Sequence, residues 1–213
     1  MPASQQPLPL PPGGLYLITP DEPDTARLEA RVAQVIGHAA MLQYRNKRAG
    51  DALRREQASR LLALCRAHGV PLVVNDDWRL AAGIGADGAH LGADDGDLAE
   101  ARRALPGRIL GASCYDSLDR ARAAHEAGAD YLAFGALFPS PTKPGARRAT
   151  PRLLREATGF GRKLVAIGGI TPDNARAVAA AGADFVAVIS AVFDAPDPAA
   201  AARSFHAALA TAG

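Results

Sequence analysis

The sequence contains only two cysteines, Cys65 and Cys114, which lie far apart and lack the spacing of metal ligands. A disulfide framework or a structural zinc site is therefore not expected, and so few thiols fit a reducing cytoplasm. No apolar run reaches the roughly 20 residues that span a bilayer. The opening residues "MPASQQPLPLPP" lack the charged start and apolar core of a signal peptide. We therefore expect a cytoplasmic protein without a membrane partner.

Neither sign of charge is in large excess, because 24 basic and 22 acidic residues leave a formal net charge of +2. The arginines are mixed with acids in segments such as "ARLEARVAQ" and "LRREQASRLL", which is typical of solvated helix faces. This pattern gives no support for nucleic-acid binding, and we expect no nucleic-acid partner. The composition leaves a homo-oligomer open.

What is present is an ordinary globular composition, with 213 residues of which 48% are hydrophobic. A chain of this length is expected to form one domain and to bury a large core without disulfides or metals. The prolines of residues 1–13 predict a flexible N-terminal arm, and residues 14–213 are predicted to form the folded domain.

Short apolar runs alternate along the chain with alanine-rich segments of helical period. Runs that are apolar throughout are typical of parallel strands covered by helices on both faces. The predicted strands are 15–19, 40–45, 71–75, 88–92, 108–113, 131–135, 163–169 and 185–190. Eight strands, each followed by a helical segment, predict a single-domain α/β protein of the (β/α)8 TIM-barrel class. An open, doubly wound sheet is the structural alternative.

Polar residues and glycines, together with Ile189, collect at the ends of these strands, where a barrel of this class builds its active site. They are Gln43, Arg45, Lys47, Asn75, Asp76, Asp77, Asp94, Asp95, Ser113, Ser140, Thr142, Lys143, Gly168, Gly169, Ile189 and Ser190. The sequence therefore predicts one rim that holds nearly all of the chemistry.

Carboxylates follow the third and the fourth predicted strands, with Asp76 and Asp95 among them. Acids from two adjacent strands suit a hard cation such as Mg2+, which takes oxygen ligands and commonly bridges carboxylates and substrate phosphates. The alternative is helix capping, which we expect for Asp77 and for either Asp94 or Asp97.

Glycines at the end of the seventh predicted strand, Gly168 and Gly169, precede a helix whose expected cap is Thr171. Glycine lets backbone N–H groups approach an anion closely, and barrels often bind phosphate after strands seven and eight. A tight turn would need the glycines for backbone reasons alone. The neighbouring Ile189–Ser190 at the eighth strand favours the phosphate site.

The loop "FGALFPSPTKPG" follows the sixth predicted strand and contains Ser140, Thr142 and Lys143. Two hydroxyls and an ammonium in one loop suit a phosphate group.

In "LQYRNK" the side chains of Gln43, Arg45 and Lys47 alternate, so they are expected to project to one side of a strand. Two cations there are costly to bury unless they meet anions; the alternative is a surface strand end with snorkelling side chains. The whole set indicates chemistry on a metal-bound diphosphate and a second phosphorylated substrate. No histidine has an evident acid–base partner, and His90 is interpreted as packed in the barrel.

These segments resemble the thiamine-phosphate synthase family, in order and at matching strand ends, over nearly the whole chain after residue 14. The segments are "LQYRNK", "VNDDWRLA", "ADGAHLGADD", "GASCYDS", "FGALFPSPTK", "VAIGGITPDN" and "VAVISAVF". The resemblance implies a (β/α)8 barrel that joins hydroxymethylpyrimidine diphosphate to hydroxyethylthiazole phosphate. The implied products are thiamine phosphate and diphosphate, and Mg2+ is the implied cofactor.

The resemblance also implies a role for each matching residue. Asp76 and Asp95 would bind the magnesium, and Lys143, Arg45 and Ser113 would be catalytic. The pyrimidine diphosphate would be held by Gln43, Arg45, Lys47, Asn75, Ser113 and Lys143. The thiazole phosphate would be held by Ser140, Thr142, Gly168, Ile189 and Ser190.

Two positions depart from the family pattern: Ala93 stands where glutamine is usual, and Ser140 stands where threonine is common. Neither change removes a charge that the chemistry needs. Two other functions are considered, a thiazole tautomerase on the same barrel and a non-catalytic barrel that binds a thiazole phosphate. A tautomerase would not need the carboxylate pair Asp76 and Asp95, so the sequence favours the synthase.

Overall fold

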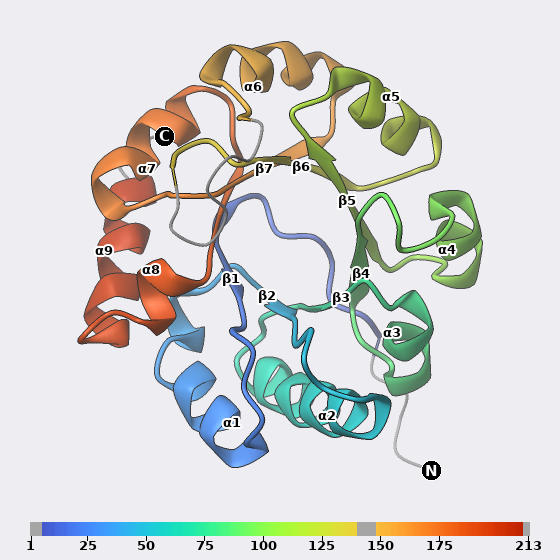
Figure 1. Cartoon of the computed structure of the whole chain (residues 1–213), viewed down its shortest axis with the longest axis vertical. Helices are drawn as coiled ribbons and strands as arrows, with labels where there is room; N and C mark the ends of the chain where they lie inside the picture. Colours follow the sequence, from blue (N-terminus) through green and yellow to red (C-terminus); the bar gives the residue numbers. More distant parts are fainter. Residues whose placement is uncertain (1–5, 140–147, 211–213) are drawn as a thin grey trace.

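The computed structural model describes residues 6–139 and 148–210, and within them the strands form one closed, parallel barrel in sequence order (Figure 1). The strands are β1 (Gly14–Ile18), β2 (Met41–Tyr44), β3 (Leu72–Asn75), β4 (Gly88–Leu91), β5 (Ile109–Tyr115), β6 (Tyr131–Gly135), β7 (Lys163–Ile167) and β8 (Phe185–Val188). β1 pairs with β8 and closes the sheet, which confirms the barrel and excludes the open sheet. Each predicted strand is present, with ends that differ by up to two residues.

Helices form a ring around the barrel, as Figure 1 shows. They are α1 (Thr25–Ala33), α2 (Asp51–Ala67), α3 (Trp78–Ile84), α4 (Leu98–Ala104), α5 (Leu118–Glu126), α6 (Pro151–Ala157), α7 (Pro172–Ala180), α8 (Ser190–Phe193) and α9 (Pro198–Ala210), with 3-10 turns η1 (Ile36–His38) and η2 (Thr158–Phe160). The expected helix caps are confirmed for Asp77, which accepts from the Leu80 N–H, and for Asp97, which accepts from the Glu100 N–H.

The strands bury both faces, which is why they read as apolar throughout. Their outward side chains, such as Leu15 and Leu42, pack under the helices in the larger core. Their inward side chains form a second core inside the barrel, with Tyr16, Met41 and Phe185 among its members. Because strand side chains alternate, each strand contributes to both cores.

The tripeptide Gly-Ala-Asp occurs four times. One copy, residues 92–94, follows β4, and the other three lie before β4, β6 and β8 and share one structure. The glycine takes a positive φ after a helix, and the aspartate carboxylate accepts the backbone N–H of a residue in the preceding strand. The pairs are Asp87 with Leu72, Asp130 with Leu110, and Asp184 with Leu164, each at 2.8 Å. In these three copies the tripeptide therefore forms the same helix-to-strand connection.

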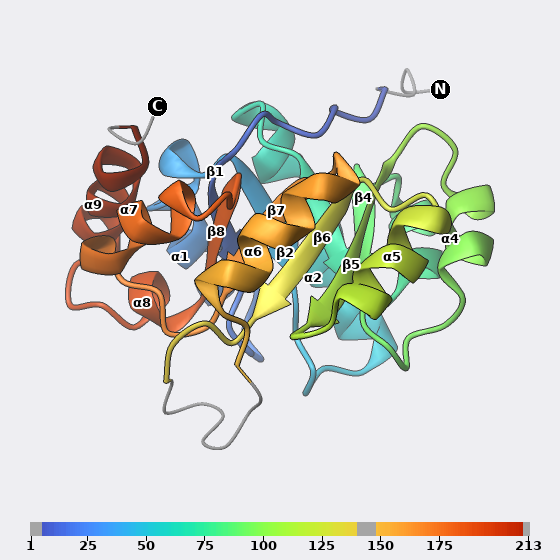
Figure 2. The same cartoon turned by 90° about the horizontal axis from the view of Figure 1, so that it is seen from above.

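Residues 6–13 cross the face of the barrel opposite to the strand tips (Figure 2). The Leu8 N–H donates to Asp87 at 2.8 Å, and Leu10 packs against the core inside the barrel. Asp87 is fully buried and so serves both β3 and this segment. The domain boundary near residue 13 stays a prediction.

We expect Asp87→Ala to lower the free energy of unfolding by about 1–3 kcal/mol, because it leaves the Leu72 N–H buried without its acceptor. Leu8→Pro removes the N–H that binds Asp87 and leaves the bond between Asp87 and Leu72 in place, so it should cost about 1 kcal/mol or less. Urea denaturation of both variants checks the ranking. Equal losses would show that the carboxylate matters only for the N-terminal segment.

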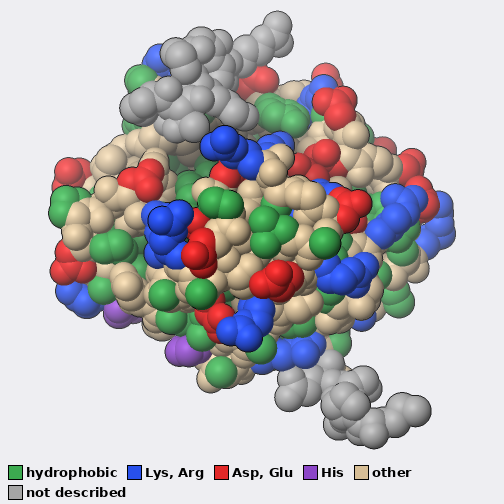
Figure 3. Space-filling view, turned by 60° about the horizontal axis from the view of Figure 1, so that its bottom comes forward, with side chains coloured by type: hydrophobic (Ala, Val, Ile, Leu, Met, Phe, Trp, Pro, Cys, Tyr) green, Lys and Arg blue, Asp and Glu red, His purple; other side chains and the backbone are tan. Residues whose placement is uncertain are grey.

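The surface carries both signs of charge, and Figure 3 shows Lys and Arg side chains beside Asp and Glu over the visible face. Ion pairs such as Arg60–Glu29, at 2.9 Å, join neighbouring helices. Within residues 6–139 and 148–210, no helix combines the length and the apolar character needed to cross a membrane.

Candidate active site at the carboxyl ends of the strands

Two carboxylates meet where β3 and β4 end. Asp76 follows β3 with a φ of 63°, and its N–H donates to the His90 carbonyl of β4 at 2.8 Å. Asp95 folds back in the next loop and accepts the Gly92 N–H at 2.8 Å. The pKa of Asp95 is raised mainly by burial and, to a smaller extent, by the neighbouring Asp76 carboxylate. The two acids therefore form a like-charged pair that a cation would stabilise.

The turn that carries Asp95 depends on Gly92. A Cβ atom on Gly92 would lie 2.7 Å from the Asp95 Oδ2, closer than real Cβ contacts. A larger residue at position 92 would force the Asp95 carboxylate to move from this position.

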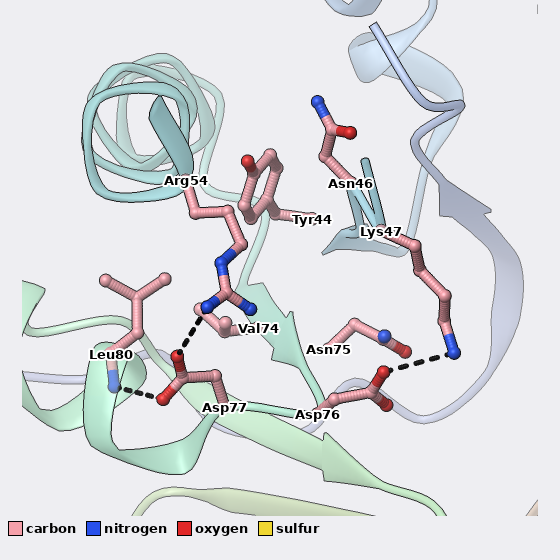
Figure 4. Close-up of a pocket in the computed structure, with 9 residues that line it drawn as sticks. All are labelled: Tyr44, Asn46, Lys47, Arg54, Val74, Asn75, Asp76, Asp77 and Leu80. Carbon is pink, nitrogen blue, oxygen red and sulfur yellow. Dashed lines mark hydrogen bonds and ion pairs between the residues drawn. The ribbon is translucent and has the colours of Figure 1, made fainter. Parts of the chain in front are cut away.

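The loop after β2 carries two cations, one of which contacts this pair. The Lys47 ammonium lies 3.3 Å from the Asp76 carboxylate, as Figure 4 shows. Arg45 pairs with Asp21 at 3.0 Å, and the same carboxylate accepts the Lys47 N–H at 2.8 Å. β2 ends at Tyr44, so Arg45 and Lys47 lie in a loop and not on the strand face that the alternation predicted.

A small pocket lies beside the acidic pair, between the ends of β2 and β3 (Figure 4). It is lined by Tyr44, Asn46, Lys47, Arg54, Val74, Asn75, Asp76, Asp77 and Leu80. Asp77 points away from Asp76, toward Arg54 at 3.9 Å and the N–H of Leu80. The adjacent acids of "VNDD" thus face two different surroundings.

A chain of hydrogen bonds crosses the inside of the barrel between Gln43 on β2 and Ser113 on β5. Gln43 Nε2 donates to the Tyr16 hydroxyl at 2.7 Å, and the hydroxyls of Tyr16 and Tyr131 lie 2.8 Å apart. His90 Nδ1 lies 2.9 Å from the Tyr131 hydroxyl, and His90 Nε2 lies 2.9 Å from Ser113 Oγ. Two predicted substrate contacts are therefore linked through three residues of other strands.

Burial determines the protonation states of the two tyrosines and the histidine in this hydrogen-bond chain. It raises the pKa of the Tyr16 and Tyr131 phenols well above the usual range, so each hydroxyl keeps its proton. It lowers the pKa of His90 to about 4, so the imidazole is uncharged near neutral pH. The interpretation of His90 as a packed histidine is confirmed by its burial, although both ring nitrogens are engaged.

The opposite side of the mouth is formed by the ends of β7 and β8. Gly168 and Gly169 follow β7 with φ values of 101° and 64°. A Cβ on Gly169 would lie 2.6 Å from the Pro139 carbonyl oxygen, so the chain just before residue 140 packs on this turn. Ile189 precedes α8, whose first residue is Ser190. Ser140, Thr142 and Lys143 lie outside the described residues.

The donor set at the mouth fits a magnesium ion shared with a substrate. Among the described residues no group of three His, Cys, Asp or Glu side chains is close enough to hold a metal. Mg2+ commonly uses only one or two carboxylates together with substrate phosphates and waters. Asp76 and Asp95 supply this number, and the repulsion between them is what the ion would relieve.

Two groups of residues escaped the sequence analysis. Asp21 binds the Arg45 side chain and the Lys47 N–H, and its place in the loop after β1, three residues beyond Ile18, was the available signal. The tyrosines Tyr16 and Tyr131 lie inside strands and carry no sequence signal for a polar role.

The sequence is similar to known proteins of one family. A profile described as thiamine monophosphate synthase matches residues 15–192. The thiamine-phosphate synthase of Xanthomonas campestris pv. campestris is 55% identical over 195 residues, which covers 91% of this chain and 94% of that protein. The protein of the same name from Aromatoleum aromaticum is 57% identical over 196 residues, with 91% and 94% covered.

A solved structure supports the match. The thiamine phosphate pyrophosphorylase from Pyrococcus furiosus superposes with a TM-score of 0.84 at 34% identity, covering 93% of this chain and 96% of that one. The chain therefore belongs to the thiamine monophosphate synthase family.

Proposed function

We propose that this protein is a thiamine-phosphate synthase, which joins hydroxymethylpyrimidine diphosphate to hydroxyethylthiazole phosphate in thiamine biosynthesis. The names of the relatives support this activity. The observation that carries it is the meeting of Asp76, Asp95 and Lys47 at the mouth of the barrel. A diphosphate leaving group needs this mixture of metal-binding acids and cations.

Each side of the mouth takes one substrate in this proposal. Asp76 and Asp95 would hold the magnesium. The pyrimidine diphosphate contacts Gln43, Arg45, Lys47, Asn75, Ser113 and Lys143, of which Arg45, Ser113 and Lys143 are catalytic. The thiazole phosphate contacts Ser140, Thr142, Gly168, Ile189 and Ser190. Positive φ at Gly168 and Gly169 turns the backbone sharply there, which suits amide contacts to phosphate.

The proposed reaction forms a bond between the thiazole ring nitrogen and the methylene carbon of the pyrimidine. The carbon–oxygen bond to diphosphate breaks, and its electron pair leaves with the diphosphate. The aminopyrimidine stabilises positive charge at the methylene carbon, so cleavage leads. Arg45 and Lys47 stabilise the departing negative charge, and bound Mg2+ would supply further charge neutralisation.

The chemistry requires no general base, because the attacking nitrogen already carries a lone pair. The uncharged, buried His90 agrees with this requirement. Binding both substrates in one mouth adds the entropic advantage of a reaction between held partners.

Incubation with both substrates, with and without Mg2+, tests the proposal. We expect thiamine phosphate in the presence of Mg2+ and an activity loss of more than about 100-fold after chelation, since metal charge stabilisation contributes several kcal/mol. Restoring Mg2+ should restore product. Isomerisation of the thiazole phosphate alone, unaffected by chelation, would indicate a tautomerase. Saturable binding without product would indicate a non-catalytic barrel.

A further inference from the structure

The hydrogen bonds inside the barrel have a direction that follows from counting protons. The Tyr16 hydroxyl is buried between two partners, the amide of Gln43 and the hydroxyl of Tyr131. Because the amide of Gln43 donates its N–H, the proton of Tyr16 finds an acceptor only if it is directed at Tyr131. The Tyr131 hydroxyl accepts that proton and directs its own at His90 Nδ1. A ring nitrogen that accepts a hydrogen bond carries no proton.

An uncharged imidazole whose Nδ1 is bare must carry its proton on Nε2. That N–H then donates to Ser113 Oγ at 2.9 Å. With an acceptor position of Ser113 already used, its own hydroxyl proton is directed elsewhere. The donor at Gln43 on β2 thereby determines the direction of each hydrogen bond as far as Ser113 on β5.

Packing holds the middle of this chain in place. Tyr131, Gly111 and His90 lie level with one another on β6, β5 and β4. Gly111 has no side chain, so the Tyr131 ring occupies the space over it and stacks on His90, with ring centroids 5.5 Å apart and planes inclined by 14°. Tyr131 is fully buried, and His90 is only 7% exposed.

We propose that His90 is a positioning residue, which through its Nε2–H fixes Ser113 as a hydrogen-bond donor toward a ring nitrogen of the bound pyrimidine. This inference rests on the proposed function, because it takes the aminopyrimidine as the occupant. The two ends of the chain offer complementary groups, an amide carbonyl oxygen on Gln43 and a hydroxyl proton on Ser113. An aminopyrimidine likewise offers an amine donor and ring-nitrogen acceptors.

The tautomer of His90 is measured directly by 15N NMR of the whole protein, with the His90 signal identified by its absence from His90→Gln. We expect a proton on Nε2 and none on Nδ1. Tyr131→Phe, which removes the proton directed at Nδ1, should lower the Nε2–H fraction. A proton on Nδ1 in the wild type would overturn the proposal, because the chain would then run in the opposite direction and make Ser113 donate to His90.

Kinetics test whether His90 acts through Ser113. His90→Asn keeps an acceptor near Nδ1 but does not reach Ser113, and should raise KM for the pyrimidine diphosphate about tenfold, the effect of one hydrogen bond. His90→Gln, which restores an N–H near the Nε2 position, should recover most of this loss. KM for the thiazole phosphate should stay near that of the wild type.

A double-mutant cycle separates positioning from general loosening. Ser113→Ala combined with His90→Asn should be no worse than Ser113→Ala alone, and multiplying losses would overturn the proposal. The exposed His68, replaced by Asn, is the control and should leave both KM values unchanged. A wild-type protein that makes no thiamine phosphate would refute the proposed function and the pyrimidine assignment, whereas the tautomer would still decide the direction of the chain.

Discussion

Asp76→Asn is expected to lower kcat/KM for thiamine phosphate formation by about 100-fold or more. The substitution removes one of two carboxylates that would hold magnesium, whose charge stabilisation contributes several kcal/mol. Asparagine tolerates the left-handed backbone of residue 76, where φ is 63°, so the fold should not suffer. The remaining activity should need a higher Mg2+ concentration, which a titration of rate against Mg2+ measures.

The neighbouring Asp77 is a matched control. Asp77→Asn removes the same charge one residue away, at a side chain that caps α3 and faces Arg54. Asparagine is also a good N-cap, so the variant should keep wild-type stability, activity and Mg2+ dependence. Equal losses in the two variants would show that the rate responds to the total charge of the loop and that Asp76 holds no ion.

The contrast between these adjacent acids shows how far sequence reasoning reaches. Residues at strand ends can be assigned to one rim because parallel strands of a barrel all point the same way. The same reasoning predicted that Asp77 caps a helix, and the structure confirms it. It also brought Lys47 and Asp76 to the same rim, where they form an ion pair.

The error at β2 has a simple cause. The strand ends at Tyr44, so the alternation that predicted one common face for Gln43, Arg45 and Lys47 stops after the first of them. Gln43 lies buried inside the barrel, whereas Arg45 is turned to Asp21. A strand end is decided by which backbone groups find partners on the next strand, and the local pattern does not contain that information.

The hydrogen-bond chain inside the barrel could not be predicted from the local sequence pattern, for a different reason. Its members come from β1, β2, β4, β5 and β6 and meet only when the sheet closes. Tyr16 and Tyr131 are ordinary strand residues by composition, because aromatic side chains are common in strands. Only a neighbouring hydroxyl or imidazole across the barrel reveals their polar ends.

Gly111→Ala is expected to be strongly destabilising, although it adds a single methyl group. An added Cβ would lie 1.9 Å from Cζ of Tyr131, whose ring is fully buried and bonded at its hydroxyl to Tyr16 and His90. The ring cannot move without breaking these bonds, so the free energy of unfolding should fall by about 1–3 kcal/mol. Urea denaturation measures the loss, and KM for the pyrimidine diphosphate should rise as His90 loses its partner.

Gly37→Ala is the control for the change of residue type, because a Cβ at Gly37 meets nothing within 4 Å. Its stability should stay within about 0.5 kcal/mol of the wild type. If Gly111→Ala were equally mild, the Tyr131 ring would have room to move aside. The hydrogen bonds from Tyr16 to His90 would then be too loosely held to fix a tautomer. The space over one glycine thus links the stability of the barrel to the direction of the hydrogen bonds at its mouth.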